Sequence, residues 1–247
     1  MRAFSAMFRT ELKLSVRGLD MVIFTIAMPL AVAVILGIIY GSKPAFEGAD
    51  HSFLAQSFGA LAAIGICASG LMGLPLVIAD YRHKKILKRY KVTPVSPTLI
   101  LAAQFAVNLL YSALSLVLMY GTLALFYDYR MAGSPLVFTG AYCLVLLSIY
   151  SLGIMVAGIA ANIKTANLLC VVLYFPMLIF SGATLPYEVM PRALQQAANV
   201  MPLTQGIKLL KDASLGSTGG QTWLPVIVMV ALAVICTGAA VRFFKWE

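Results

Sequence analysis

Charged side chains are scarce in this sequence. Only 11% of its 247 residues are Asp, Glu, Lys or Arg, while 61% are hydrophobic. A soluble domain of ordinary composition carries about 25% charged residues, so this chain has too little polar surface to cover a soluble globule. The low charge content therefore argues against a soluble protein and predicts that lipid solvates much of the chain.

Residue types that carry chemistry are also sparse. The chain has two histidines and four cysteines, and it contains no C-x-x-C pair, so a metal or thioredoxin-type site is not indicated. No G-x-x-x-x-G-K-[ST], H-E-x-x-H or G-x-S-x-G motif occurs, and the apolar runs hold almost no ionisable residues. The sequence therefore predicts no cofactor of its own, and it disfavours an ion-coupled transporter. Energy for any transport would have to come from another protein.

Six apolar runs are long enough, or nearly long enough, to cross a bilayer, which needs about 20 residues of helix. Helices are favoured over barrel strands because the runs are apolar all round and do not alternate with a period of two. The fifth run is the shortest, and Pro176 predicts a kink in it. The sequence thus predicts an all-α integral membrane protein with one domain, residues 1–247, and six transmembrane helices. The runs are 21–40, 53–79, 98–126, 136–161, 165–180 and 223–241.

Lys and Arg residues are divided unevenly between the two sides that these runs define. Thirteen of the 18 fall on the side of the N-terminus and five on the other side, so the positive-inside rule predicts that both termini are cytoplasmic. Because the net charge of +9 lies in short segments beside apolar runs, it indicates a membrane surface and not nucleic acid. The five Lys and Arg residues on the side opposite the N-terminus are Lys43, Arg130, Arg192, Lys208 and Lys211.

Residues 1–20 predict an amphipathic helix at the cytoplasmic interface of the membrane. Apolar side chains recur every four residues on one face, and basic side chains recur in the same way on a different face. Such a helix fits a plain anchor on anionic lipid, and it equally fits a helix that also contacts protein. The apolar face holds Phe4, Phe8 and Leu12, and the basic face holds Arg9, Lys13 and Arg17.

A basic segment, residues 80–97, follows the second run. Six basic residues lie between Arg82 and Lys91, and three large apolar side chains share one helical face. Pro94 ends this predicted helix, and Pro97 fits the first position of the next one. A topology signal needs only charge, so the apolar face favours a helix that docks on a partner protein. The predicted docking residues are Arg82, Lys85, Ile86, Leu87, Lys88, Arg89 and Tyr90.

The third run carries a polar stripe. Four polar side chains recur at i, i+4, i+7 and i+11, on one helical face. Polar groups avoid lipid, so this face should look into the bundle or into a cavity. Two interpretations stay open: hydrogen bonding between helices, or the wall of a substrate pathway. The polar stripe consists of Gln104, Asn108, Tyr111 and Ser115.

The outer segment, residues 181–222, predicts two short helices that are too short and too polar to span a membrane. Such helices are tolerated at membrane depth where they pack on protein. Glu188 is the one acid in the first piece, where it fits a helix N-terminal charge or, alternatively, a gating role. The candidate outer-gate residues are Pro186, Glu188 and Pro191.

Three further sequence runs are informative in their order and spacing. They are Leu87-Lys-Arg-Tyr-Lys-Val-Thr-Pro-Val-Ser-Pro97, Phe180-Ser-Gly-Ala-Thr-Leu-Pro-Tyr-Glu-Val-Met-Pro191, and Met201-Pro-Leu-Thr-Gln-Gly-Ile-Lys208 followed by Leu215-Gly216. Taken together, these runs resemble the ABC-2-type transporter permeases, the membrane subunits of bacterial ABC exporters. Met201 stands where the family usually has asparagine, and residues 81–85 fill the place of an acidic residue followed by glycine.

This resemblance implies a six-helix permease of the bacterial cytoplasmic (inner) membrane, with an interface helix, a coupling helix after the second span and short outer helices before the sixth. It also implies a permease dimer, homomeric or with a related chain, on two separate ATP-binding subunits that hold the ATP and Mg. The expected function is the membrane subunit of an ATP-driven exporter of a hydrophobic or amphipathic substrate. One alternative is a non-transporting membrane scaffold or immunity protein. A membrane-embedded enzyme is less supported, because the apolar runs lack clustered His, Asp or Glu.

Overall fold

The computed structural model describes residues 2–41, 43, 51–86, 97–180, 191–216 and 223–243. Within these ranges the regular structure is helical, without β-strands. Two π-helical segments, η1 (Ile23–Ala27) and η2 (Ala68–Gly73), lie inside longer helical stretches. In chain order the α-helices are α1 (Arg2–Gly18), α2 (Asp20–Val22), α3 (Met28–Tyr40), α4 (Phe53–Cys67), α5 (Leu74–His83), α7 (Pro97–Tyr127), α8 (Pro135–Ile159), α9 (Ile163–Phe180), α10 (Arg192–Val200), α11 (Pro202–Leu215) and α12 (Trp223–Phe243).

In the part of the chain that the structure describes, five helical stretches are long and apolar enough to cross a membrane. The apolar helix α9 is shorter, because its 18 residues give about 27 Å of helix against about 30 Å of hydrocarbon. Five of the six predicted spans therefore have the required length, and α9 remains a predicted span. The five are Asp20–Tyr40, Phe53–His83, Leu99–Tyr127, Pro135–Ile159 and Trp223–Arg242.

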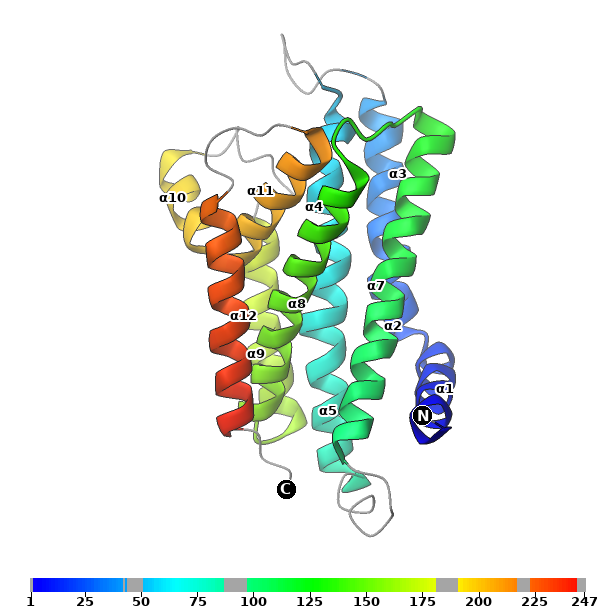
Figure 1. Ribbon diagram of the computed structural model, residues 1–247, viewed down its shortest axis with the longest axis vertical. Helices are drawn as coiled ribbons and strands as arrows, with labels where there is room; N and C mark the ends of the chain where they lie inside the picture. The colour runs from blue at the N-terminus through cyan, green and yellow to red at the C-terminus, as the bar shows by residue number, and fades with distance from the viewer. Residues whose placement is uncertain are drawn as a thin grey trace.

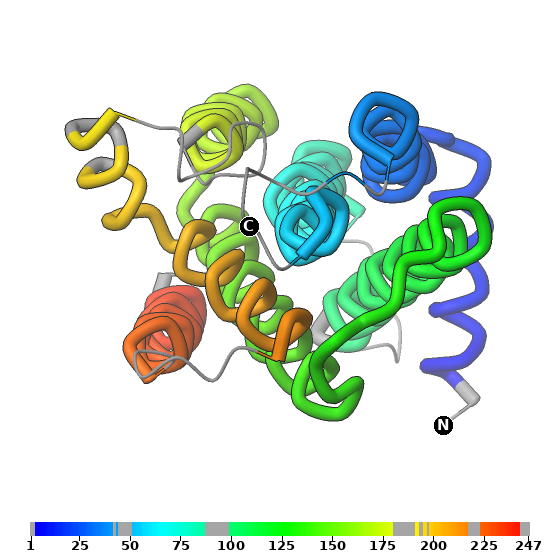
Figure 2. The backbone as a smooth tube through the Cα atoms, turned by 90° about the horizontal axis from the view of Figure 1, so that it is seen from above, coloured from blue at the N-terminus to red at the C-terminus, as the bar shows by residue number. Residues whose placement is uncertain are grey.

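The long helices run side by side as one bundle (Figure 1). The beginning of α1 and the end of α12 lie at the same end of this bundle, and α10 and α11 lie at the opposite end. Figure 2 shows α4 near the middle of the arrangement, with the other long helices around it. The central column, α4–η2–α5, therefore contacts most of the other helices, and its side chains form much of the core.

Glycines allow the central column to pack closely on its neighbours. A Cβ atom at Gly153 of α8 would stand 2.0 Å from the carbonyl oxygen of Gly70 in η2. A Cβ atom at Gly59 of α4 would stand 2.7 Å from the backbone nitrogen of Lys211 in α11. In both cases the neighbouring atom is backbone and cannot rotate away, so only glycine fits these contacts.

Several helix ends follow from local sequence chemistry. The Oγ atom of Ser52 accepts a hydrogen bond from the backbone N–H of Ala55 at 3.2 Å and caps α4. Pro97 is the first residue of α7, as the sequence predicts, and Pro202 is the first residue of α11. Helix α11 ends where Gly216 adopts the left-handed conformation with φ 69°, which glycine reaches without strain.

The basic segment differs from the sequence prediction at its beginning. Arg82 and His83 form the last turn of α5, and the chain then turns at Lys85, which has φ 55°. A left-handed residue after the last turn ends an α-helix, so a docking helix that runs unbroken from Arg82 to Lys91 is wrong. Pro176 lies inside α9, which continues to Phe180.

Candidate functional site

The polar stripe of α7 faces the interior of the protein. Gln104, Asn108, Tyr111 and Ser115 are all buried, with exposed fractions between 0% and 5%. Ser115 lies close to α4, because its Oγ atom is 3.2 Å from the position that a Cβ atom would take at Gly65. The carbonyl oxygen of Thr25 in η1 is 3.5 Å from the same position. The prediction that this face looks into the bundle is therefore confirmed.

At one end of the stripe, three side chains from three helices meet. Both the hydroxyl of Tyr81 in α5 and the Nε2 atom of Gln104 in α7 donate to the Oε2 atom of Glu11 in α1, each at 2.5 Å. The Gln104 amide also donates to the Tyr81 hydroxyl oxygen at 3.4 Å. Glu11 is only 3% exposed. These bonds tie the N-terminal helix to the end of the central column and to the beginning of α7.

Burial raises the pKa of the Glu11 carboxyl above its ordinary value, because the charged form loses its water. The hydrogen bonds from Tyr81 and Gln104 favour the charged form and oppose this shift. Glu11 forms no ion pair with any residue that the structure describes. The described residues around it thus supply hydrogen-bond donors but no paired positive charge.

Farther along α7, three hydroxyl groups close a hydrogen-bonded triangle. The Ser69 and Ser112 Oγ atoms are 2.7 Å apart, and the Tyr150 hydroxyl lies 2.8 Å from each of them. Tyr142 also donates to the backbone carbonyl oxygen of Ser112 at 2.9 Å. The triangle joins η2, α7 and α8 in the buried interior, where satisfied polar networks hold helices together.

Beside the triangle, other buried polar atoms have no partner. The Asn108 Oδ1 atom, the Tyr111 hydroxyl and the Thr25 Oγ1 atom accept or donate no hydrogen bond within the described ranges. Thr25 belongs to η1, which contacts both α7 and η2. π-Helical segments inside α-helices often mark functional sites. The two π-helical segments and the unpartnered atoms therefore make this region the best candidate for a functional site.

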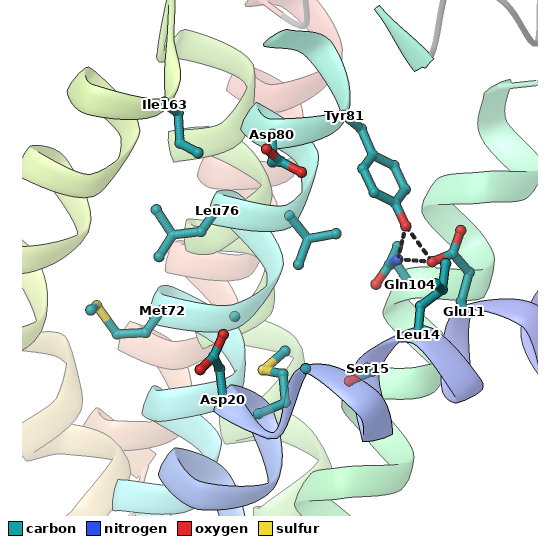
Figure 3. Close-up of a pocket in the computed structure, with 14 residues that line it drawn as sticks. Glu11, Leu14, Ser15, Asp20, Met72, Leu76, Asp80, Tyr81, Gln104 and Ile163 are labelled. Carbon is teal, nitrogen blue, oxygen red and sulfur yellow. Dashed lines mark hydrogen bonds between the residues drawn. The ribbon is translucent and has the colours of Figure 1, made fainter. Parts of the chain in front are cut away.

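A pocket of about 360 Å³ adjoins the Glu11 end of the stripe, and we call it the α1–α5 pocket. Figure 3 shows Glu11, Tyr81 and Gln104 together on one side of it, with Asp20 and Met72 on another side. Its walls come from α1, α2, η2, α5 and α7, and from Ile163 at the beginning of α9. The pocket combines apolar walls with carboxylates, so it can hold a molecule that is partly apolar and partly positive.

The predicted interface helix packs on protein along one side. Phe8 and Leu12 pack against a cluster formed by Ile26, Val107 and Tyr111, while Phe4 stays 38% exposed. The three basic side chains of the predicted basic face, Arg9, Lys13 and Arg17, are exposed. The helix therefore contacts protein and still presents a basic surface.

Part of the predicted docking segment lies within the described residues. The Arg82 guanidinium donates to the carbonyl oxygens of Ala160 at 2.6 Å and Ala157 at 3.1 Å, and so caps the end of α8. Lys85 is exposed and Ile86 is partly buried. Leu87, Lys88, Arg89 and Tyr90 lie outside the described residues.

The predicted outer gate lies mostly outside the described residues. Pro186 and Glu188 fall there, and Pro191 is exposed directly before α10. Two short helices, α10 and α11, lie in the described part of this segment, while the expected piece that carries Glu188 falls outside the described residues. Helix α11 buries Leu203, Ile207 and Leu210, so it packs on the bundle along one side.

Sequence analysis missed Glu11 and the hydroxyl triangle. Glu11 is the one acid in α1 and follows Met7 by four residues, which puts it on the face that packs on protein. That position was a usable signal. Ser112 follows Asn108 by four residues and could have been added to the stripe, but its pairing with Tyr150 depends on how α7 and α8 pack.

Comparison with known proteins places the chain in a family. The family model for the ABC-2 type transporter matches residues 2–214. The chain is similar to the inner membrane transport permease YhhJ of Escherichia coli (strain K12), with 30% identity over 171 residues. YhhJ of Shigella flexneri gives the same identity over the same length. The match covers 66% of this chain and 45% of each relative, so the chain spans less than half of their length. On this evidence the chain belongs to the ABC-2 type transporter family.

Proposed function

We propose that this chain is the membrane-spanning subunit of an ATP-driven exporter in the bacterial inner membrane, and that it moves a hydrophobic or amphipathic substrate. A separate ATP-binding subunit would hold the ATP and Mg, and a second permease copy or a related chain would complete the complex. The family match over residues 2–214 carries this proposal. The relatives' name, inner membrane transport permease, supports the location and the transport role.

The distribution of basic residues in the bundle supports the orientation in which both termini are cytoplasmic. Arg9, Lys13 and Arg17 lie in α1, and the last turn of α5 carries Arg82 and His83. These helix ends lie at one end of the bundle (Figure 1). The positive-inside rule puts such an end in the cytoplasm, which is where an ATP-binding subunit would dock. Cysteines placed at Lys88 and Ser217 should then react with impermeant labels from opposite sides of the membrane.

Docking of the ATP-binding subunit can be tested at the apolar face of the basic segment. We expect Leu87→Ala combined with Tyr90→Ala to reduce stimulation of the ATPase and transport, while membrane insertion stays intact, because buried apolar anchors dominate such contacts. The measurement is ATP hydrolysis and transport by the complex in proteoliposomes. A matched control is Leu125→Ala with Leu136→Ala, which removes two side chains that are each 83% exposed.

Two outcomes would contradict the proposal. Normal coupling in the Leu87 and Tyr90 double variant would leave the basic segment as a topology signal only. If no ATP-binding chain co-purifies with the protein from native membranes, the scaffold alternative is favoured over the exporter.

The polar stripe is the proposed substrate pathway. Asn108 forms its hydrogen bond within its own helix, with the Gln104 carbonyl oxygen at 2.8 Å, and forms none with another helix that the structure describes. We expect Asn108→Leu to change export per molecule while the thermal unfolding midpoint changes little, because no interhelical bond is lost. A loss of about 0.6 to 2 kcal/mol in stability with normal export would instead assign the residue to helix packing.

A further inference from the structure

The α1–α5 pocket gathers negative charge in a chain that is strongly basic. The chain has nine acidic residues and a net charge of +9, yet Glu11, Asp20 and Asp80 all line this one pocket. Asp80 is paired with Lys84 at 2.7 Å. Glu11 and Asp20 have no ion pair within the described part of the chain. Among the residues that the structure describes, no side chain is paired with either of these two carboxylates.

The Glu11 carboxylate can accept more hydrogen bonds than the described residues give it. Tyr81 and Gln104 both donate to its Oε2 atom, and its Oε1 atom accepts no hydrogen bond from the described residues. A carboxylate that is 3% exposed is costly to keep charged without a cation or further donors. A positively charged hydrogen-bond donor in the pocket would both donate to the Glu11 Oε1 atom and balance the carboxylate charge.

The size and lining of the pocket restrict the kind of cation. A volume of about 360 Å³ is far more than one metal ion needs. In the part of the chain that the structure describes, no group of three His, Cys, Asp or Glu side chains could hold a metal ion. Met72, Leu76, Val77 and Ile163 supply apolar wall between the acidic positions. This combination fits a cation with an apolar body.

We propose that the α1–α5 pocket binds an amphipathic organic cation, with its ammonium group at Glu11 and its apolar body against Met72, Leu76 and Ile163. Asp20 contributes long-range attraction from the exposed rim. This binding site goes beyond the proposed export function and does not depend on it, because binding can be measured without ATP. The ammonium group could belong to a soluble amine or to the headgroup of an amine-bearing phospholipid.

The test uses dansylcadaverine, a fluorescent aromatic compound that carries a primary ammonium group, with the purified full chain in phosphatidylcholine nanodiscs. Fluorescence anisotropy should show saturable binding. Glu11→Gln keeps the shape of the side chain and should weaken binding about 30-fold, because it removes the buried charge partner. Asp20→Asn should weaken it only about threefold, since that carboxylate is exposed. Leu76→Trp, which fills the apolar wall and keeps all three acids, should abolish binding.

Asp128→Asn is the matched control, because it also removes one carboxylate but from an exposed position just after α7. It should leave the dissociation constant unchanged. The proposal is overturned if wild-type protein shows no saturable binding, if Asp128→Asn weakens binding as much as Glu11→Gln, or if Glu11→Gln and Leu76→Trp both bind like wild type. Thermal unfolding of each variant checks that it is folded. If Glu11→Gln does not fold, Leu76→Trp still tests the proposal.

A second series separates the two sources of ammonium. Replacing part of the phosphatidylcholine with phosphatidylethanolamine should weaken the apparent binding of dansylcadaverine to wild type if a lipid headgroup occupies the pocket. If the apparent affinity stays the same, the natural occupant is a soluble amine. Either result supports the site itself, provided that the Glu11→Gln effect is present.

Discussion

The central helices and the peripheral helices of this protein are alike in composition and opposite in environment. In the apolar windows of Phe53–His83 and Pro135–Ile159, 83% and 61% of the residues are buried in the protein. The corresponding shares are 28% for Asp20–Tyr40, 28% for Leu99–Tyr127 and 22% for Trp223–Arg242. Apolar character alone therefore does not tell which helix faces protein and which faces lipid, because both surroundings favour apolar side chains.

Close backbone contact distinguishes the two groups. Cβ atoms at Gly59 and Gly153 of the central helices would stand within 3.0 Å of backbone atoms of another helix. In the peripheral helices, a Cβ atom at Gly37 of α3 would meet only the side chain of Tyr127, and Gly121 of α7 and Gly238 of α12 have nothing within 4 Å. Without a hydrophobic driving force between helices in lipid, small residues that allow close approach supply much of the association. The comparison therefore predicts that the same substitution has different effects in the two groups.

The largest expected loss of stability follows substitution of Gly153. Gly153→Ala places a Cβ atom 2.0 Å from the Gly70 carbonyl oxygen, so α8 and η2 must separate. We expect a loss of about 3 kcal/mol, or roughly 10 °C in the thermal unfolding midpoint. Gly238→Ala is the control, and it should be neutral or slightly stabilising, because alanine favours helix and the position is open. Equal midpoints for the two variants would remove the distinction between central and peripheral helices.

A smaller effect is expected at the hydroxyl triangle. Tyr150→Phe removes one corner, while Ser69 and Ser112 can still bond to each other at 2.7 Å. The expected loss is about 1 kcal/mol, the usual size of one interhelical hydrogen bond in a membrane protein. Tyr120→Phe on the exposed side of α7 serves as the control and should change the midpoint little. A larger loss at Tyr120 than at Tyr150 would contradict the assignment of the triangle to helix packing.

The smallest effect is pH-dependent and concerns Glu11. Its pKa is raised by burial, so the folded state binds the proton more tightly than the unfolded state does. This contribution is fully present below the ordinary pKa of about 4.5 and is lost as pH rises through the raised value. Tyr81 and Gln104 face the carboxyl from α5 and α7, and Asp20 and Asp80 line the same pocket.

Glu11→Gln does not titrate, so its stability relative to wild type should increase between pH 4.5 and neutral pH. We expect a gain of about 2 °C in the unfolding midpoint at neutral pH. Midpoints of both proteins across this pH range give the result, with Asp128→Asn beside them to show the effect of an exposed carboxylate. A difference that shrinks as pH rises would mean that the hydrogen bonds outweigh burial.

Much of the fold could be predicted from the sequence because hydrocarbon thickness fixes the length of an apolar helix. The third predicted run, 98–126, is found as Pro97–Tyr127, and the fourth, 136–161, is found as Pro135–Ile159. The inward face of α7 was also predictable, since unpaired polar groups avoid lipid. The same rule applied to α1 would have singled out Glu11.

Other features depend on tertiary packing and have no local signature. The π-helical segments η1 and η2 contain ordinary apolar and small residues, so their sequences do not distinguish them from the α-helices around them. The Arg82 guanidinium was assigned to docking by its charge, but its hydrogen bonds to Ala157 and Ala160 arise only when α5 lies against α8. The docking and pathway roles of the predicted residues stay predictions.

The segment η2 also sets the rotational phase of the central column. A π-helical turn accommodates about one residue more than an α-helical turn, and one α-helical residue corresponds to about 100° of rotation. If η2 relaxed to an ordinary α-helix at constant length, Tyr81 would turn away from Glu11, and Arg82 would turn away from the end of α8, in the same movement. Deleting one residue within η2 would instead leave both side chains on their partners. The wider turn of η2 thus fixes the rotation of α5 about its own axis. That rotation in turn places Tyr81 on the N-terminal helix and Arg82 on the end of α8.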